Sequence, residues 1–418
     1  MDIELVTIGT ELLLGFTLDS NGAEIARTLA AQGVRVVRRT SVGDRAEDIR
    51  AAVADALNRT RAVITTGGLG PTRDDITKKV VADLFDAPLE FDESVWGNLL
   101  ERFARLERKP AASNRSQAEV PRGATVLRNR WGTAPGLWME GAPGLVVLLP
   151  GVPLEMRRLM EHEVVPRLTQ RATGSVIKSL TIRTSGIPES SLAERIGEIE
   201  AEIAPLTLAY LPGLEGVDLR ISAWNLESDD ADRRLRSAAE VLRQRAGDNV
   251  YGEGDNDLAA LVLDEARSQG LRLAVAESCT GGLVGARLTD IPGSSDVFVG
   301  GVIAYDNAVK QELLAVPERL LAEHGAVSEP VVRAMADGAA RRFGVNAAIA
   351  VTGIAGPGGG SEEKPVGTVW LGCLVHGRVE SRRAMFPGSR HEIRARAAQA
   401  ALLLLHRQLS PVTQPAHR

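Results

Sequence analysis

The first part of the fold is decided by AVITTGGLGP (62–71), a short apolar run that ends in a glycine-rich turn. A helical pattern, ITKKVVADLF (76–85), follows, so the stretch joins a buried strand to a helix. Working outward, strand patterns alternate with helical patterns, in the order IELVTIG (3–9), SNGAEIARTLAAQG (20–33), VRVVRRTSV (34–42) and AEDIRAAVADALNRT (46–60). This alternation predicts βαβ units, and therefore an α/β domain with a doubly wound, mostly parallel sheet.

Residues typical of helix ends support this assignment. Gly33 stands where the helix 20–33 must end, and Asp44 with Glu47 resembles a capping box that opens the next helix. Further along, GLVVLLPGVPLEMRRLM (144–160) predicts another buried strand that runs into a helix. We therefore expect the first domain to span residues 1–170.

Residues 175–252 predict a small α+β linking module. A strand and a helix are followed by a hairpin pattern, LTLAYLPGLEGVDLRISAW (206–224), and then by a further helix and strand. The hairpin contains Gly213-Leu-Glu-Gly216, which formally matches the GxxG loop of proteins that bind single-stranded RNA. Because the glutamate would repel phosphate, we interpret this loop as a plain hairpin turn.

Residues 255–410 predict a third domain of three α/β layers. Its strand patterns include LRLAVAE (271–277), VFVGGVIAY (297–305), NAAIAVT (346–352) and the pair VGTVWLGCLVHGR (366–378) with VESRRAMFPG (379–388). The last two favour an antiparallel pair, so we expect a mixed sheet. A capping box, Ser389 with Glu392, opens the last helix, and the polar tail 411–418 is expected to be disordered.

The composition limits the classes of function. At 418 residues, with 44% hydrophobic and 25% charged residues, the chain is typical of several folded domains. A formal net charge of −5 argues against nucleic acid or a membrane as the main partner. Two cysteines cannot form a disulfide framework, and the N-terminus lacks the pattern of a secretion signal. We therefore expect a cytoplasmic protein.

Three loops of the first domain follow predicted strands: 9–11, 66–75 and 150–155. Ligands of open parallel sheets bind beyond the carboxyl ends of the strands, so these loops are expected to line one crevice. Glycine-rich turns offer backbone N–H groups to phosphate. The residues expected to form this nucleotide site are Glu11, Asn21, Thr66, Gly67, Gly68, Gly70, Asp74, Asp75, Pro150 and Gly151.

The carboxylates of these loops would repel a phosphate unless a divalent metal ion bridges the charges. Asp74, Asp75 and Glu155 are the candidate metal ligands, and the pattern favours a metal-dependent pyrophosphate chemistry. The alternative is structural. Thr72 and Asp75 would then cap the helix 76–85, and the glycines would only turn the chain.

In the third domain, AESCTGG (276–282) lies where a buried strand ends and a helix begins, which suits a nucleophile and an oxyanion hole. Tyr305 and Lys310 follow the next strand, and a lysine made neutral by desolvation can take the proton of Ser278. Two alternatives stay open. Cys279 is a rival nucleophile, or Ser278 caps a helix while Lys310 is solvated.

Five strings in this order make the third domain resemble the CinA C-terminal amidase, a nicotinamide-nucleotide deamidase: AESCTGG, IPGSS, YDNAVK, HGAVSEPVV and VTGIAGPGGGSEEKPVGTVW. The resemblance implies hydrolysis of the amide of nicotinamide mononucleotide (NMN), without a cofactor. It makes Ser278 the nucleophile and Lys310 the general base, with Tyr305 beside them. It places oxyanion and substrate contacts at Glu277, Thr280, Gly281, Gly282, Ser294, Ser295, Thr352, Gly353 and Arg390.

The string TTGGLGPTRDD (65–75) resembles the molybdopterin-binding domain, which also forms the first half of CinA proteins. In that family the domain implies hydrolysis of ADP-ribose to AMP and ribose 5-phosphate, with a divalent metal ion and in some members potassium. The resemblance also implies a homodimer, and the module at 175–252 corresponds to the family's linking domain.

A protein that binds without turnover is the alternative from a different class. Its first domain would hold a molybdopterin-like or adenylated ligand, and its third would offer a partner surface in competence or DNA-damage responses. A binding module has no need of a nucleophile and a base together, so Ser278, Tyr305 and Lys310 argue against an inert third domain.

Overall fold

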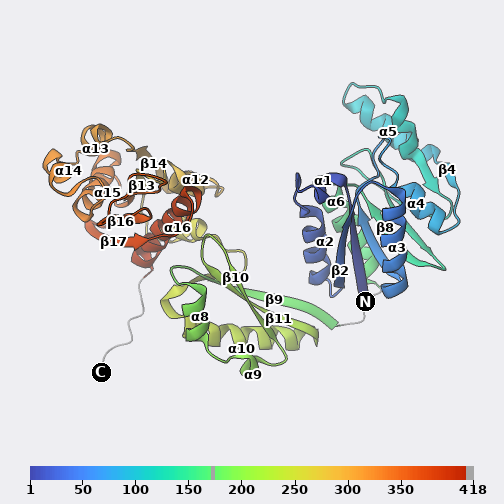
Figure 1. The fold of residues 1–418 in the computed structure, drawn as a ribbon, viewed down its shortest axis with the longest axis horizontal. Coiled ribbons are helices and arrows are strands. Elements are labelled where there is room, and N and C mark those ends of the chain that lie inside the picture. The colour runs from blue at the N-terminus through green and yellow to red at the C-terminus, as the bar shows by residue number, and fades with distance from the viewer. Residues whose placement is uncertain (171–174, 411–418) are drawn as a thin grey trace. The chain divides into compact units, whose positions relative to one another are not determined.

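The computed structural model describes residues 1–170 and 175–410, so the predicted tail, 411–418, lies outside the described residues. The contacts of the chain divide it into two compact units, residues 1–178 with 222–234, and residues 179–221 with 235–418 (Figure 1).

The first unit is built on a sheet with the strand order β2-β1-β3-β8-β7-β6. The strands are β1 Asp2–Ile8, β2 Arg35–Val42, β3 Ala62–Thr66, β6 Thr125–Leu127, β7 Gly136–Gly141 and β8 Gly144–Leu149. The first four strands in this order run parallel, whereas β7 and β6 are antiparallel additions at one edge. The predicted mostly parallel α/β fold is confirmed. A short antiparallel pair, β4 Leu89–Phe91 and β5 Glu119–Pro121, lies apart from this sheet.

Helices cover both faces of the sheet. They are α1 Thr10–Leu13, α2 Ser20–Ala31, α3 Ala46–Thr60, α4 Thr77–Leu84, α5 Glu93–Arg105, η1 Ala112–Ala118, α6 Pro153–Leu159, η2 Met160–Val164 and α7 Val165–Thr169. Successive side chains of a strand point to opposite faces. Accordingly, Leu5 of β1 packs in one core with Ile25 of α2, while Val6 packs in another with Ile49 of α3. These two cores are the doubly wound arrangement that the sequence predicts.

One predicted helix cap is wrong. Arg45, not Asp44, is the N-cap of α3, and its side chain makes no capping hydrogen bond. The carboxylate of Asp44 instead accepts hydrogen bonds from the backbone N–H and the hydroxyl of Thr10, both at 2.8 Å. Asp44 therefore ties the loop after β2 to the loop after β1, a contact between segments that the local pattern does not reveal.

The linking module has an antiparallel hairpin in a sheet of order β10-β11-β9-β12. Its elements are β9 Ser175–Thr184, α8 Glu189–Ile196, α9 Glu200–Ile203, β10 Thr207–Pro212, β11 Val217–Glu227, α10 Ser228–Ala246, η3 Gly247–Asn249 and β12 Val250–Glu253. The single helix that the sequence predicts between the first strand and the hairpin is interrupted at Gly197, whose positive φ of 66° is incompatible with a continuous helix.

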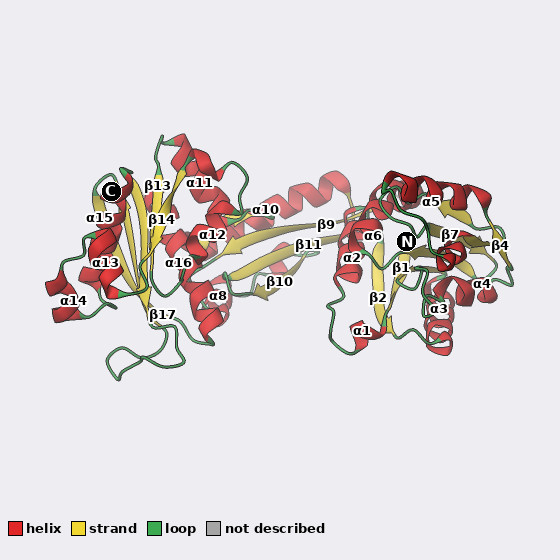
Figure 2. Ribbon diagram, turned by 90° about the horizontal axis from the view of Figure 1, so that it is seen from above, coloured by secondary structure: helices red, strands yellow, loops and turns green. Residues whose placement is uncertain are grey.

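The third domain has a five-stranded sheet of order β14-β13-β15-β16-β17. Its elements are α11 Leu258–Ser268, β13 Leu273–Glu277, α12 Leu283–Thr289, η4 Ser294–Asp296, β14 Phe298–Ile303, α13 Asn307–Leu314, α14 Glu318–His324, α15 Glu329–Phe343, β15 Ala347–Gly353, β16 Thr368–Val375, β17 Arg378–Met385 and α16 Arg390–Leu409. β14, β13 and β15 are parallel, and β16 and β17 antiparallel. The predicted mixed sheet is confirmed (Figure 2).

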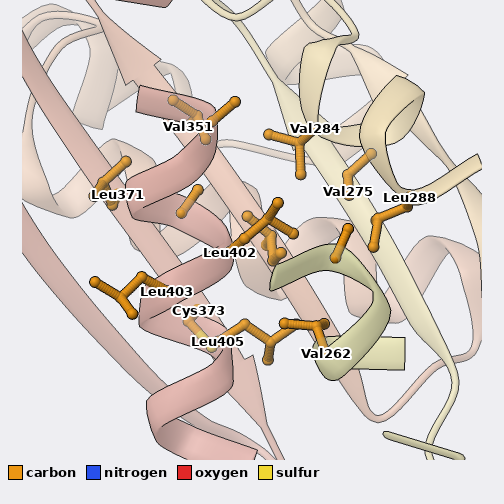
Figure 3. Packing of buried hydrophobic residues seen from close by; sticks show 14 of the residues in the cluster. Val262, Val275, Val284, Leu288, Val351, Leu371, Cys373, Leu402, Leu403 and Leu405 are labelled. Atoms are coloured by element: carbon orange, nitrogen blue, oxygen red, sulfur yellow. The ribbon is translucent and has the colours of Figure 1, made fainter. Parts of the chain in front are cut away.

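Helices cover both faces of this sheet as well. On one face α11, α12 and α16 pack on the strands, with Val262, Leu288 and Leu402 in a single core (Figure 3). On the other face α13 and α15 pack on alternate residues of the same strands, such as Ala276 and Ala350. The third domain therefore has three layers. Among the described residues, no helix is long and apolar enough to cross a membrane.

Candidate active sites

The carboxyl ends of β13, β14 and β15 bring the predicted nucleophile and its neighbours to one edge of the third domain's sheet. The backbone N–H of Ser278 donates to the carbonyl of Val351 on one side, at 2.9 Å. On the other side, the N–H of Ala304 donates to the carbonyl of Glu277, at 2.7 Å. Because the three strands are parallel, Ser278 and Tyr305 leave adjacent strands at the same edge.

Lys310 lies in α13, directly after this edge, and only 1% of its surface is exposed. Its ammonium donates to the backbone carbonyl of Tyr305, at 3.2 Å. Burial lowers the pKa of Lys310, against the opposing influence of Asp306 and Cys279. Because Lys310 is buried, the alternative in which its side chain is solvated is wrong. Burial also favours the neutral amine that a general base needs.

Ser278 is buried, with 8% of its surface exposed, and it caps no helix, since Gly282 is the N-cap of α12. No hydrogen bond joins its hydroxyl to the amine of Lys310 within the described part of the chain. Catalytic hydrogen bonds are often formed only once substrate is bound, so this geometry is compatible with proton transfer from serine to lysine.

Cys279, the rival nucleophile, is buried in the hydrophobic core of the domain. Burial raises the pKa of its thiol to about 12. The attacking species of a cysteine is the thiolate, which is scarce near neutral pH at such a pKa. Cys279 therefore fits the position of a small core residue better than that of a nucleophile.

Glu277 is where the structure differs most from the sequence prediction. The residue is 1% exposed, and its carboxylate accepts backbone hydrogen bonds from Gly282, Val284 and Gly285, at 3.0, 3.1 and 2.8 Å. It thus occupies N–H groups at the start of α12 that the sequence prediction left for an oxyanion. Through these hydrogen bonds, Glu277 fixes the loop that follows Ser278. Because its carboxylate faces the start of α12, Glu277 does not fit the predicted role of contacting substrate.

Glu277→Gln is expected to lower the free energy of unfolding of the third domain by about 1–3 kcal/mol, because the amide NH₂ cannot accept the hydrogen bonds that the carboxylate oxygen accepts. Chemical denaturation followed by fluorescence measures this change. Glu362→Gln, at an exposed position of the same domain, is the matched control. Equal unfolding free energies for the two variants would contradict the supporting role of Glu277.

The loop 280–282 is held by a residue that the sequence analysis did not single out. Arg394, in α16, donates to the carbonyl of Thr280 at 2.7 Å. The hydroxyl of Thr280 is buried and has no hydrogen-bond partner among the described residues. Gly281 and Gly282 turn the chain with positive φ values of 60° and 95°. Arg394 lies one helical turn after Arg390, and that spacing was the available signal.

Arg390 lies where the resemblance implied, at the edge that holds Ser278. Its guanidinium donates to the hydroxyl of Tyr305 at 2.9 Å and to the carbonyl of Gly356 at 2.7 Å. Thr352 also lies at this edge, but its hydroxyl donates to the carbonyl of Ala326 at 2.9 Å. Gly353 packs so closely on β16 that an added Cβ would lie 2.7 Å from a methyl group of Val369. Of these residues, Arg390 is the one with a charge to offer a ligand.

Ser294 and Ser295 lie at the other end of the sheet. They belong to η4, which precedes β14, and the neighbouring Val297 accepts a backbone hydrogen bond from Leu273, the first residue of β13. Ser278 follows the last residue of that strand, about 16 Å away at 3.3 Å per residue. Within one chain, the predicted contact of these serines with the substrate is therefore wrong, because α12 returns the chain to the opposite edge.

In the first domain, the predicted loops are joined by a network of hydrogen bonds. The side-chain amide of Asn21 donates to the hydroxyl of Thr66 at 3.1 Å and to the carbonyl of Gly151 at 2.8 Å. The hydroxyl of Thr66 donates to the carbonyl of Pro150 at 2.9 Å. The carbonyl oxygen of Asn21 is buried without a partner among the described residues.

A cavity of about 120 Å³ lies at this network. Among the predicted residues, Glu11, Asn21, Thr66 and Gly151 line it, together with Asp19, which caps α2 and pairs with Arg39 at 2.8 Å. The glycine-rich turn follows Thr66, but its glycines do not line the cavity. At Gly67 and Gly68, φ is 111° and 68°, and an added Cβ would lie about 2 Å from Ile8 and Thr77, so no other residue fits.

Asp74 and Asp75 lie in the exposed loop after this turn. Both carboxylates accept a hydrogen bond from the hydroxyl of Thr72, which lowers the pKa of Asp74, and the carboxylate of Asp75 packs against Gly70. Neither Thr72 nor Asp75 caps α4, whose N-cap is Ile76 without a side-chain bond. The capping part of the structural alternative is therefore wrong, whereas Gly67 and Gly68 do turn the chain, as that alternative also expects.

Glu155 does not join these two aspartates. Its carboxylate accepts a hydrogen bond from Asn129 at 2.5 Å and packs against Gly132, and burial raises its pKa. Within 1–170 and 175–410, no three acidic, histidine or cysteine side chains are grouped as metal ligands. The predicted set Asp74, Asp75 and Glu155 is therefore corrected to the aspartate pair, since α6 directs Glu155 towards a different loop.

Lys78 is a further residue that the sequence analysis missed. It lies in α4, which follows the loop that contains Asp75, and its ammonium donates to the carbonyl of Ser116 at 2.6 Å. Burial lowers the pKa of Lys78 to about 8. The charges of Glu119 and Asp75 oppose this shift. Its position one residue after the start of α4 carried no distinctive sequence signal.

Comparison with known proteins covers nearly the whole chain. Residues 4–170 match the probable molybdopterin binding domain, residues 179–252 the damage-inducible protein CinA KH domain, and residues 255–409 the CinA C-terminal domain. A CinA-like protein of Gemmatimonas aurantiaca is 56% identical over 411 residues, which are 97% of this chain and 96% of that protein. The chain belongs to the CinA-like family.

Another CinA-like protein, from Salinibacter ruber, is 42% identical and matches 98% of this chain and 100% of its own length. Among solved structures, the competence/damage inducible protein CihA from Agrobacterium tumefaciens is 43% identical, with a TM-score of 0.35, over 35% of this chain and 91% of that one.

In this CinA-like chain, Gly213–Gly216 closes the hairpin between β10 and β11, and the N–H of Gly213 donates to the carbonyl of Gly216 at 2.8 Å. This is the turn that the sequence predicts.

Proposed function

We propose that the third domain hydrolyses the amide of NMN to nicotinate mononucleotide and ammonia. The observation that carries this proposal is the buried Lys310, with its lowered pKa, beside the edge where Ser278 leaves β13. A buried lysine without a bound carboxylate is costly to the fold, and such groups cluster at functional sites. Family membership supports the same activity.

In the proposed reaction, the hydroxyl oxygen of Ser278 attacks the carboxamide carbon while the neutral amine of Lys310 takes the hydroxyl proton. The lysine then returns that proton to the departing nitrogen, and ammonia leaves an acyl-enzyme. A water molecule, deprotonated by the same amine, attacks the acyl carbon and releases nicotinate mononucleotide and the free serine. Atoms and charge balance with one water consumed for each ammonia formed.

Arg390 is the proposed contact for the substrate's phosphate. It stands at the first position of α16, where the helix N-terminus adds to its positive charge, and the hydroxyl of Tyr305 and the carbonyl of Gly356 fix its guanidinium. Tyr305 is 61% exposed, so a ligand can reach this pair.

The direct test is ammonia release from NMN by the purified full-length protein in the presence of a chelator. We expect turnover without added metal, because the serine mechanism uses no metal ion. A folded protein that releases no ammonia would refute the amidase proposal. It would favour the rival proposal, a CinA-like protein that binds nucleotides without turnover.

We propose that the first domain hydrolyses ADP-ribose to AMP and ribose 5-phosphate. The network of Asn21, Thr66 and Gly151 beside a glycine-rich turn supports a phosphate ligand there. Two adjacent carboxylates, Asp74 and Asp75, fit a magnesium ion, which proteins commonly hold through one or two carboxylates and the substrate's phosphates. Such an ion would neutralise charge on the pyrophosphate, and the hydrogen bonds of Asn21 and Thr66 would hold the surrounding loops in place. We also propose that both reactions take place in the cytoplasm. From the family resemblance, we propose that the protein forms a homodimer.

Asp75→Asn is expected to lower metal-dependent release of AMP from ADP-ribose by about 10²-fold or more, because the amide is a much weaker metal ligand than the carboxylate. Release of AMP measured by chromatography checks this. Asp83→Asn, at an exposed position in the helix that follows the loop, is the control and should keep its rate. ADP-ribose binding without hydrolysis in the unaltered protein would instead support a binding role for this domain.

A further inference from the structure

A cavity of about 580 Å³ lies within the second unit and is lined by none of Ser278, Tyr305 and Lys310. Its walls come from residues 185–188 and 213–217 of the linking module and from β17 and α16 of the third domain. The volume lies in the range of pockets that bind small organic ligands. Neither proposed reaction uses this cavity.

The wall formed by α16 combines polar and apolar side chains on one helix face. Arg396, Gln399, Leu403 and Arg407 recur at intervals of three or four residues, which places them above one another along the helix. Phe386, after the end of β17, adds an aromatic surface. The lining can therefore contact both a charged group and a flat apolar one.

The charge of the lining is strongly positive. It contains four arginines, Arg382, Arg383, Arg396 and Arg407, against one carboxylate, Glu215. That carboxylate is already paired, with arginines outside the lining, at 3.2 and 3.3 Å. Burial lowers the pKa of Arg407, and the neighbouring charge of Arg382 lowers it further. An anion placed between Arg382 and Arg407 would relieve this repulsion.

Two hydrogen-bond donors of the lining are unsatisfied. Among the described residues, Nε2 of Gln399 and Nε of Arg407 are buried and have no partner. Gln399 is 2% exposed, and its oxygen is fixed by a hydrogen bond from Arg287, so its amide nitrogen cannot turn to another acceptor without breaking that bond. Buried donors without partners are rare and destabilising, but these two atoms are shielded from solvent, so a ligand in the cavity would contact the charged side chains of the lining instead.

We propose that this cavity is a second ligand site that binds a small organic anion with a flat apolar body, of the size of a nucleoside monophosphate. The anionic group pairs with the guanidinium groups of Arg382 and Arg407, and the flat body packs on Phe386 and Leu403. Because its walls come from the linking module and the third domain, the bound ligand holds these two parts together. The site is independent of the amidase proposal, since it shares no residue with that mechanism.

The test uses the full chain and the fluorescent anion 8-anilinonaphthalene-1-sulfonate as the probe. We expect saturable binding with one equivalent per chain that depends on the arginines. In Arg382→Gln with Arg407→Gln, the dissociation constant of that equivalent should rise about tenfold, as expected for loss of a charged hydrogen bond. Arg378→Gln, an exposed arginine of the same strand that does not line the cavity, should bind as the unaltered protein does. AMP should displace the probe and adenosine should not.

Three outcomes would overturn the proposal: identical titrations for all variants, displacement by adenosine as effective as by AMP, or displacement by a short single-stranded RNA at lower concentration than AMP. The last would favour a nucleic-acid strand over a small anion. Melting curves check that the variants fold. If the double variant unfolds, Arg382→Gln alone carries the test, because Arg382 is exposed and its loss removes charge without removing packing.

Discussion

Replacing Ser278 by alanine is expected to lower kcat/KM for NMN hydrolysis by at least about 10⁴-fold, because alanine has no oxygen to which the acyl group can bind. The hydroxyl is lost while the loop stays in place, since Glu277, Arg394 and the backbone bond to Val351 hold that loop independently of the hydroxyl. Steady-state ammonia release measures the loss, and unchanged melting shows that the fold is intact.

Cys279→Ala is the matched control for that variant. It lies at the adjacent position, removes a nucleophilic atom of similar size, and is expected to keep activity within about tenfold, because a buried thiol contributes packing only. If activity were lost with Cys279 and kept without Ser278, the serine mechanism would be refuted and a cysteine mechanism would replace it.

That Ser278 and Tyr305 lie at the same edge was predictable because the direction of strands that alternate with helices follows from local patterns, whereas the order of the strands does not. Strands that alternate with helices run parallel, and their carboxyl ends meet at one edge. To predict where Ser278 and Tyr305 lie, it was therefore enough to find the ends of two strands in the sequence. Arg390 required the resemblance, since nothing local links the start of α16 to Tyr305.

Three of the errors have a common cause, because each depends on where a side chain points after the chain turns. Glu277 is the last residue of a strand, and its position alone does not tell whether the carboxylate faces the crevice or the start of α12. The direction of Glu155 depends on Asn129, and that of Asp44 on Thr10, both far away in sequence. Ser294 was misplaced for a simpler reason, since one crossover helix moves a segment to the opposite edge.

Lys310→Met is expected to abolish amidase activity, by about 10³-fold or more, and at the same time to stabilise the third domain by roughly 1–2 kcal/mol at pH 7. Both effects have one physical source. Among the described residues, no carboxylate bonds to the buried amine, so the fold tolerates the charge poorly, and methionine fills the same space without that charge. Urea denaturation measures the stability, and Lys364→Met, the other lysine of this domain, is the control.

The pH dependence separates this explanation from a purely structural one. Since the pKa of Lys310 is lower in the folded than in the unfolded chain, the unaltered protein is penalised at every pH below the folded pKa, and the penalty disappears as pH rises towards the unfolded value of about 10.4. The stability advantage of Lys310→Met should therefore be constant below the folded pKa, fall as pH rises above it, and vanish in alkali. Over the same range kcat/KM of the unaltered protein should rise as the amine loses its proton, with an inflection below 10.4. An advantage that persists at alkaline pH would mean that methionine stabilises by packing alone, and that Lys310 carries no buried charge to remove.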